Sequence, residues 1–347
     1  MRIAVCEAGP ATPDRDAGAR AVNDLIESAR ELGCDARFFD ESAGQLVERL
    51  AAFSPRVVFI SRPGLFARLH PRLGKFSVPV VFMAHDLHHV RLALQREYDA
   101  RLHPQAASVM RLVEGYCFRN ADLSILPTSQ EAETVRKEFP GSAVTWMPYF
   151  AMPEEQRLAK PVEPPRLVFV GSSAHAPNRD GITWFVRNVW PVMQAPVGWF
   201  ALSVCGAWDA GMVHELEGNG VAFHGALDED ELGNVMRRAA AGIAPLRFGA
   251  GMKRKTLDYL SRGLPVLSSS YGIEGLRTSP ALGGRVPGVI NCVSVDDWVS
   301  GIRRVTGDFD LWNRLSREGH AYIGEAFSRA GHRAGLNNVL ASLGVSA

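Results

Sequence analysis

The chain of 347 residues is 46% hydrophobic and 22% charged, values that exclude disordered and fibrous proteins. The formal net charge is only +1 and the basic residues match no nucleic-acid motif, so we expect no nucleic-acid partner. At about 150 residues per domain, the length predicts two domains.

Strands and helices alternate along the first half of the chain. Short apolar runs predict strands at residues 2–6, 35–39, 55–61, 78–86 and 122–129. Apolar residues at helical spacing predict helices at 17–33, 46–53, 92–120 and 130–139. Strands with continuous apolar cores, each followed by a helix, indicate a parallel sheet covered on both faces, so the predicted fold class is α/β.

The alternation stops at residues 151–165, where four prolines predict a linker, and then starts again. Strands are predicted at 166–171, 200–206, 221–225, 241–246 and 264–270, and helices at 182–193, 228–239, 253–263, 295–305, 311–327 and 331–343. We therefore expect a first domain at 1–150, a second at 166–325, and a final helix at 326–347 that packs back on the first.

The cysteines and the longest apolar runs indicate the cellular compartment in which the protein is expected. The five cysteines are scattered and include no Cys-x-x-Cys pair, which favours buried thiols in a reducing compartment. No apolar run reaches the roughly 18 residues of a membrane-spanning helix. These features predict a cytoplasmic protein.

The strongest local signal lies between Pro245 and Glu274. A predicted strand leads into a loop with Gly249 and Gly251, and the next helix begins with three cations, at positions 253–255. Cations suit the C-terminus of a helix, whereas the N-terminus attracts anions. A bound anion such as a diphosphate would relieve this conflict, and the alternative is a solvated basic face beside a turn. The segment has neither a Walker A pattern nor a complete Gly-x-Gly-x-x-Gly.

Several segments resemble retaining GT-B glycosyltransferases of the family 4 type. The Gly-x-Gly-x-Lys loop, its helix and the following Gly-Leu-Pro-Val resemble the family's donor-binding segment, and residues 169–191 resemble the opening of its second domain. In the first half, residues 13–33, 82–91 and 114–133 resemble other family segments. The resemblance implies a GT-B fold, in which two Rossmann-like domains face each other across a cleft.

The resemblance also implies roles for individual residues. Lys253, with Arg247 as companion and Lys255 in reserve, would neutralise the diphosphate, and Asp258 would hold the ribose hydroxyls. His85 would contact the donor sugar near the reaction centre. The other donor-binding positions would be Gly18, Gly171, Ser172, Gly251, Glu274 and Gly275. For Asp258, Glu274 and His85 the alternatives are a helix-surface carboxylate, a turn carboxylate and a structural histidine.

We expect the first domain to bind the acceptor, with Asp86 and Arg91 on that side. Residues 56–120 carry ten Lys and Arg against four Asp and Glu, a net charge of +6. With Leu65, Phe66 and Leu69 exposed, this face would suit a lipid-linked acceptor and peripheral contact with the inner face of the membrane. The alternative is an ordinary solvated basic face.

One position departs from the family pattern, and several clusters raise the question of a metal. Ala250 stands where the wider family has a glutamate, which puts the sugar's identity in doubt. We interpret the acidic triplets Asp14–Asp16, Asp228–Asp230 and Asp308–Asp310 as structural or acceptor-side residues. His88 and His89, which follow His85, match no zinc pattern. We expect no metal and no cofactor.

The sequence therefore predicts a retaining, metal-independent glycosyltransferase. Its donor would be a UDP- or GDP-linked sugar, and its acceptor a glycan, a lipid-linked or a small molecule. Two alternatives stay open. A non-catalytic nucleotide-sugar-binding subunit is suggested by Ala250, and a nucleotide-sugar 2-epimerase would share the fold.

Overall fold

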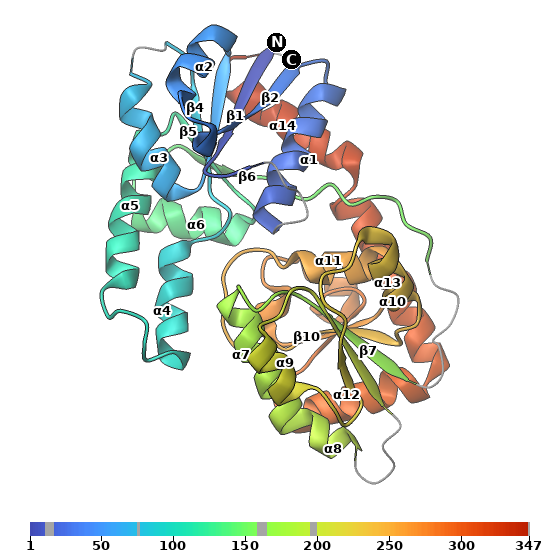
Figure 1. Ribbon diagram of the computed structural model, residues 1–347. Coiled ribbons are helices and arrows are strands. Elements are labelled where there is room, and N and C mark those ends of the chain that lie inside the picture. Colours follow the sequence, from blue (N-terminus) through green and yellow to red (C-terminus); the bar gives the residue numbers. More distant parts are fainter. Residues whose placement is uncertain (11–16, 75–76, 158–164, 195–199, 346–347) are drawn as a thin grey trace. The chain divides into compact units, whose positions relative to one another are not determined.

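The computed structural model of the protein describes residues 1–10, 17–74, 77–157, 165–194 and 200–345. The chain divides into two compact units, and Figure 1 labels many of their elements. The first unit comprises Met1–Ala151, Ala250–Met252 and Phe327–Ala347. The second comprises Met152–Gly249 and Lys253–Ala326.

The first unit contains a six-stranded parallel sheet in the order β2-β1-β3-β4-β5-β6. Its strands are β1 Arg2–Glu7, β2 Asp35–Asp40, β3 Val57–Ser61, β4 Val80–Met83, β5 Leu123–Leu126 and β6 Val144–Trp146. Every residue of β3, β4 and β5 is buried, as expected for a parallel sheet that is covered on both faces. The strand order changes direction between β1 and β3, so the loops after these strands lie at a topological switch point.

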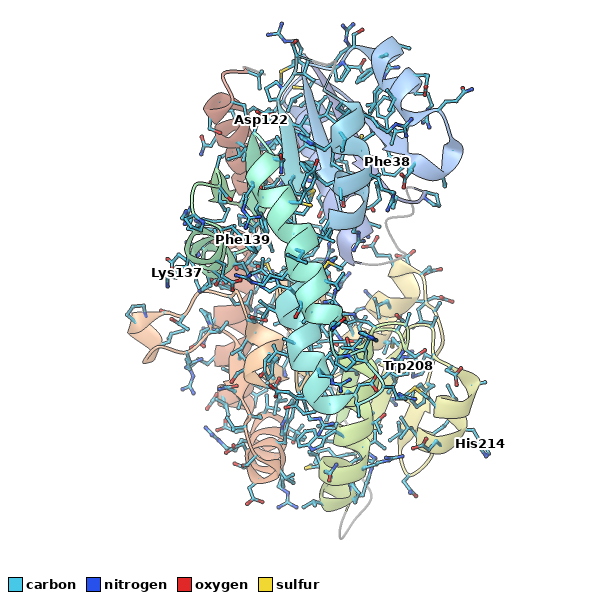
Figure 2. The ribbon with its side chains drawn as sticks, turned by 90° about the vertical axis from the view of Figure 1, so that its left-hand side faces the viewer. Phe38, Asp122, Lys137, Phe139, Trp208 and His214 are labelled. Carbon is cyan, nitrogen blue, oxygen red and sulfur yellow. The ribbon has the colours of Figure 1, made fainter. Side chains whose placement is uncertain are left out.

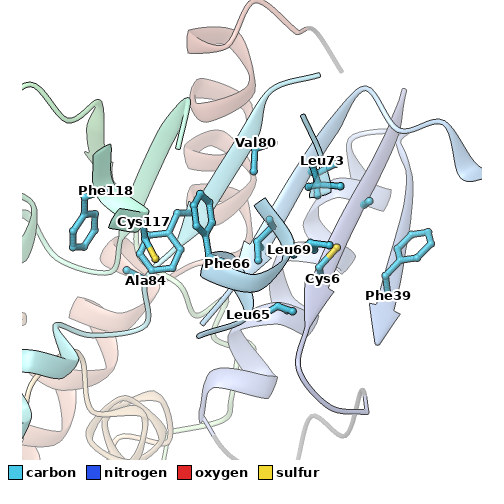
Figure 3. Close-up of a cluster of buried hydrophobic side chains, with 14 of the residues drawn as sticks. Cys6, Phe39, Leu65, Phe66, Leu69, Leu73, Val80, Ala84, Cys117 and Phe118 are labelled. Atoms are coloured by element: carbon cyan, nitrogen blue, oxygen red, sulfur yellow. The ribbon is translucent and has the colours of Figure 1, made fainter. Parts of the chain in front are cut away.

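Helices cover both faces of this sheet (Figure 1). They are α1 Ala17–Glu31, α2 Leu46–Phe53, α3 Pro63–Leu69, α4 His88–Tyr98, α5 Ala106–Asn120, α6 Ser129–Glu138 and α14 Arg329–Ser342, with short 3-10 helices at Glu41–Ala43 and His70–Arg72. Helices α2, α3 and α5 bury Leu50, Phe66 and Phe118 in one apolar cluster that also contains Cys6 and Phe39 of the sheet (Figure 3).

This cluster corrects one expectation from the sequence. Leu65, Phe66 and Leu69 were expected on an exposed face, but they are 1%, 0% and 2% exposed. They belong to α3, which starts at Pro63 directly after β3 and turns its apolar side onto the sheet. A burial of this kind is favourable by about 2 kcal/mol per large apolar side chain, and it removes these residues from any outer surface.

The last helix of the chain packs against the first. In α14, His332 Nδ1 lies 2.8 Å from the hydroxyl of Ser28 in α1. Arg329 pairs with Glu27 at 3.1 Å and with Glu31 at 2.8 Å, and Arg333 also pairs with Glu31. A buried hydrogen bond with three ion pairs at its rim thus fixes α14 on α1, beside which Figure 1 shows it.

The second unit contains a second six-stranded parallel sheet, in the order β12-β11-β10-β7-β8-β9. Its strands are β7 Arg166–Val170, β8 Ala201–Cys205, β9 Val221–Phe223, β10 Ala241–Ala244, β11 Val266–Ser268 and β12 Val289–Asn291. The strand order changes direction between β7 and β10. The loops after these two strands therefore mark the switch point of the second sheet.

Helices also surround the second sheet. They are α7 Ala176–Trp184, α8 Trp190–Gln194, α9 Ala210–Leu216, α10 Glu229–Arg237, α11 Arg254–Ser261, α12 Val295–Gly307 and α13 Phe309–Ala326, with a π-helix at Phe185–Val189 and 3-10 helices at Ser270–Ile273 and Pro280–Leu282. Trp190, Trp298 and Trp312 are the largest side chains of its core. Near one edge, Trp208 lies 6.1 Å from the ring of Phe169 and 5.6 Å from that of Phe223 (Figure 2).

The α/β fold class is confirmed, and the differences concern helix boundaries. The helix predicted at 92–120 is two helices, α4 and α5, because Asp99 ends the first in an extended conformation. Part of the predicted linker, residues 158–164, lies outside the described residues. In the part of the chain that the structure describes, every helix is too short or too polar to cross a membrane.

Candidate functional site

Three loops gather at the carboxyl ends of β7, β10 and β11, at the centre of the second sheet. They contain Gly171 and Ser172 after β7, the segment from Pro245 after β10, and Ser269 to Gly275 after β11. Ligands of open α/β sheets bind at such a position, because loops from neighbouring strands diverge there. Most of the predicted donor-binding residues lie on these loops.

Tyr259 holds α11 in place against the sheet. Its hydroxyl accepts a 2.7 Å hydrogen bond from the backbone N–H of Val170 at the end of β7. Gly242 of β10 allows the ring to lie flat on the strand, because an added Cβ would come within 2.3 Å of it. The position of α11, and hence of Lys255 and Asp258, follows from this contact.

Lys255 lies beside the first of these loops. Its Nζ is 2.6 Å from Oδ1 of Asn178, near the start of α7, and 4.1 Å from the centre of the Phe169 ring. The Asn178 amide in turn donates to the carbonyl oxygen of Ser172. A Cβ on Gly171 would lie 2.6 Å from Asn178 Nδ2 and 3.0 Å from Lys255 Nζ. A larger residue at position 171 would therefore displace Asn178 or Lys255. A backbone turn, an amide and an ammonium group meet at this point.

The surroundings of Lys255 make its positive charge less stable than that of an exposed lysine. Burial, and secondly the nearby charge of Lys253, lower the pKa of Lys255 to about 7. Among the residues that the structure describes, Lys255 forms no ion pair with a carboxylate. A buried cation in such surroundings is unfavourable, and an anionic ligand would stabilise it. This is the environment expected of a lysine that binds a diphosphate.

The other predicted cations have carboxylate partners. Lys253 Nζ lies 3.2 Å from Glu274 Oε2, and Arg247 Nε lies 2.8 Å from Asp180 Oδ2 in α7. Lys253 is only 8% exposed, whereas Glu274 is 40% exposed at the side chain. The structure thus brings together Lys253 and Glu274, which were both predicted to bind the donor.

The remaining donor-side positions are also placed. Asp258 pairs with Arg254 at 2.8 Å, one turn earlier in α11. Gly275 has a left-handed φ of 81°, and Gly251, with φ of 71°, groups with the first unit. Gly18 lies in the first turn of α1, also in the first unit.

His85 lies at the carboxyl end of the first sheet, directly after β4. Its Nε2 is 2.6 Å from the hydroxyl of Ser61, at the end of β3, and that hydroxyl is 2.7 Å from Oε2 of Glu7, at the end of β1. Its ring lies edge-on to Tyr149 at 5.8 Å. Three neighbouring strands thus contribute one side chain each to a hydrogen-bonded row.

Asp86 and Arg91, predicted on the acceptor side, form an ion pair with each other at 2.8 Å. His88 Nε2 lies 2.9 Å from the same carboxylate. Burial opposes ionisation of Asp86, but the hydrogen bonds and charges of His88 and Arg91 outweigh it and keep the pKa of Asp86 well below its usual range. His89 instead faces Glu114, at 2.6 Å.

The acidic triplets have structural surroundings where the structure describes them. Asp228 forms a capping box with Glu231 at the start of α10, and Asp308 accepts from the N–H of Leu311 at the start of α13. Asp14 and Asp16 lie outside the described residues. Among residues that the structure describes, three or more His, Cys, Asp or Glu side chains nowhere form a group suited to a metal ion.

The sequence prediction missed four polar residues of these sheet ends. Asn178 and Asp180 belong to the Pro-Asn-x-Asp stretch after β7, whose spacing gave a family resemblance but no roles. Glu7 and Ser61 are single polar residues that end apolar strands. A polar residue at the carboxyl end of a parallel strand was the available signal for both.

Comparisons with known proteins concern the family and the fold of the chain. Residues 164–306 match the family model described as glycosyl transferases group 1. An uncharacterized 44.6 kDa protein in the cps region of Klebsiella pneumoniae is 28% identical over 120 residues, which is 33% of this chain and 31% of that protein. The aligned part thus spans about a third of that relative.

Solved structures resemble the whole chain. Sucrose-phosphate synthase from Thermosynechococcus elongatus has a TM-score of 0.79 and 17% identity, covering 99% of both chains. Anabaena HepE in complex with UDP-glucose has a TM-score of 0.72 and 13% identity, covering 99% of this chain and 100% of that one. The chain therefore has the GT-B fold, and its residues 164–306 match the group 1 glycosyltransferases.

Proposed function

We propose that the protein is a glycosyltransferase that moves a sugar from a UDP- or GDP-linked donor to an acceptor. The observation that carries this proposal is the convergence of Lys255, Asn178 and Gly171 at the switch point of the second sheet. A buried ammonium group beside a backbone turn without room for a side chain suits a compact anion such as a diphosphate.

The ion pairs Lys253–Glu274 and Arg247–Asp180 suggest how the other two cations would take part in donor binding. When the diphosphate binds, it would compete with Glu274 for Lys253 and with Asp180 for Arg247, which frees these carboxylates for sugar hydroxyls. Asp258 would accept hydrogen bonds from the ribose hydroxyls. Gly18, Gly171, Ser172, Gly251 and Gly275 are proposed as the positions where the backbone approaches the donor.

We propose transfer with retention of configuration, without a metal or other cofactor. Lys253 and Lys255 would stabilise the departing diphosphate as its charge develops, which is the task that a metal ion performs in other enzymes. The transition state resembles an oxocarbenium ion. A leaving phosphate oxygen would take the proton of the acceptor hydroxyl on the same face, and His85 would contact the donor sugar.

Known proteins support the donor and the pathway class. HepE has been solved with UDP-glucose, and a pneumococcal O-GlcNAc transferase with UDP and GlcNAc, on the same fold. The Klebsiella relative comes from a cps region, which supports a role in polysaccharide biosynthesis. We propose a cytoplasmic protein with a glycan or lipid-linked acceptor.

Peripheral membrane contact is proposed for α5 rather than α3. Val109 and Leu112 in α5 are 56% and 74% exposed. Arg111, also in α5, lies over the ring of Phe139, which Figure 2 labels, and pairs with Glu138, so part of the basic charge is neutralised. Flotation with anionic liposomes that captures the wild type and not Leu112→Ser would support this contact, and no flotation would refute it.

The function is tested by binding and then by product analysis. We expect UDP or GDP to raise the melting temperature, because a ligand that binds only the folded state stabilises it. Labelled UDP- and GDP-sugars are then incubated with glycan, lipid-diphosphate and small-molecule acceptors, and the anomeric configuration of the product is read by NMR. Absence of nucleotide binding would refute the proposal, and an inverted product would refute retention.

Ala250 favours one alternative, a non-catalytic subunit that binds a nucleotide-sugar. Alanine stands here where the family that the sequence resembles is expected to have a glutamate. The same incubation separates the cases: transferred sugar identifies a transferase, bound but unchanged donor a non-catalytic subunit, and a free epimer an epimerase.

A further inference from the structure

The row of Glu7, Ser61 and His85 has a defined direction of hydrogen bonding. A serine hydroxyl has one proton, and an ionised carboxylate only accepts. Ser61 must therefore donate its proton to Glu7 Oε2, 2.7 Å away, since the reverse arrangement would face two lone pairs at this distance. The Ser61 oxygen then accepts from His85 Nε2 at 2.6 Å.

Glu7 is surrounded by hydrogen-bond donors. It is 2% exposed, and a buried carboxylate needs donors. Oε1 accepts from the backbone N–H of Ala8 at 3.0 Å, and Oε2 lies 3.4 Å from Nε of Arg62. Glu7 thus faces a cation, an amide and a hydroxyl.

The backbone after β3 is strained where it brings these groups together. Arg62 has φ of 74° and ψ of 131°, a region that non-glycine residues rarely adopt. Residues in such conformations persist when surrounding contacts impose them, and they cluster at functional sites. Here the unusual turn lets Arg62 reach back to Glu7 while Ser61 stays at the strand end.

The imidazole ring is supported from a second side. Tyr149 lies edge-on to His85, with the two ring planes at 79°. The Tyr149 hydroxyl donates to the carbonyl oxygen of Ile125 at 2.5 Å, which fixes its ring. His85 is therefore held both by a hydrogen bond and by an aromatic contact.

We propose that Glu7 and Ser61 are positioning residues that fix His85 as the Nε2–H tautomer, so that Nδ1 is the atom that accepts a hydrogen bond from a sugar hydroxyl. That the partner of His85 Nδ1 is a sugar rests on the proposed function. The assignment of the Nε2–H tautomer does not depend on it. Outer partners of this kind set which ring nitrogen carries the proton. In Glu7→Gln the amide can donate to Ser61, whose proton then turns toward His85 and reverses the tautomer.

The tautomer is read by NMR on the full-length protein labelled with 15N-histidine. His85→Gln identifies the resonances. We expect Nε2–H in the wild type and in Ser61→Thr, which keeps the hydroxyl, and a shift toward Nδ1–H in Glu7→Gln. In Ser61→Ala, where Nε2 loses this partner, we expect a mixture of the two tautomers. Ser124→Ala is the matched control, because Ser124 is a buried serine in β5 whose hydroxyl has no partner among the described residues.

Kinetics provide the second measurement. Glu7→Gln and Ser61→Ala should lower kcat by about 10- to 100-fold, the range known for the outer partners of metal-bound histidines, with the KM for the donor nearly unchanged. Ser61→Thr should restore kcat, and Ser124→Ala should match the wild type. Wild-type Nδ1–H, or a tautomer unchanged in Glu7→Gln, would overturn the proposal. If the tautomer behaves as expected and yet every donor stays unprocessed, the proposed function falls and the tautomer assignment stands.

Discussion

The two parallel sheets have the same architecture but carry different polar residues at their carboxyl ends. In the second unit, cations gather at the switch point: Lys255 is buried beside Asn178, and Lys253 pairs with Glu274. In the first unit, an acid, a hydroxyl and an imidazole form a row across β1, β3 and β4. A cationic end suits an anion, and a fixed imidazole suits a neutral hydroxyl. The fold provides the place, and a few polar residues decide what binds there.

The comparison predicts that variants at the two ends fail in different ways. Lys253→Met and Lys255→Met should weaken UDP binding by about 100-fold, because each removes a desolvated positive charge. His85→Ala should leave UDP binding unchanged and lower kcat by about 100-fold. Isothermal titration and steady-state kinetics measure the two effects.

The control for this prediction is Arg238→Ala, which removes an exposed cation at the end of α10 in the second unit. It should change neither quantity. If His85→Ala weakened UDP binding as much as the lysine variants, the division of tasks between the two sheet ends would be wrong.

The sequence predicted the α/β class and the donor loops because both depend on local patterns. Apolar runs, a glycine loop and a basic helix start can be read without knowing neighbours. The hydrogen-bond and ion-pair partners of these residues could not be predicted from the sequence. Arg247 and Asp180 are 67 positions apart, and Ser61 and Glu7 are 54 apart. Only the strand order brings them together, so the ion pairs and the histidine row stayed hidden.

The burial of α3 was missed for a related reason. Pro63 begins a helix whose apolar residues face the sheet, but the seven residues are too few to show helical spacing. In a basic stretch, Leu65 and Phe66 then resembled a surface patch. Burial depends on which side of a short helix meets the sheet, and that is set by tertiary packing.

The two units should also respond to pH through different groups, and the first does so through its stability. Burial lowers the pKa of His332 to about 4. The unfolded chain takes up this proton near pH 6.5 and the folded chain does not, so stability falls as the pH drops from about 6.5 to 4, by up to about 3 kcal/mol. Urea unfolding across this range measures the loss.

His332→Gln should flatten this acid dependence of the stability, whereas His214→Gln, which changes an exposed histidine labelled in Figure 2, should not. An equal loss of stability between pH 6.5 and 4 in the wild type and in His332→Gln would contradict the assignment of His332.

The pKa of a second histidine of the first unit, His89, is shifted in the opposite direction. Burial opposes its charge, but the hydrogen bond to Glu114 raises the pKa of His89. Its contribution is present at low pH and is lost as the pH rises through the raised value.

In the second unit, pH should act on ligand binding through Lys255. Its pKa of about 7 means that the ammonium form, which an anion requires, is depleted above neutral pH. The dissociation constant of a UDP-sugar should therefore rise by about tenfold between pH 6 and 8. A nucleotide-sugar is the right probe because its diphosphate is esterified at both ends and does not titrate in this range. Lys255→Met should bind weakly with little dependence on pH. An equal slope in the wild type and the variant would show that another group titrates, and the assignment of the pH dependence to Lys255 would be wrong.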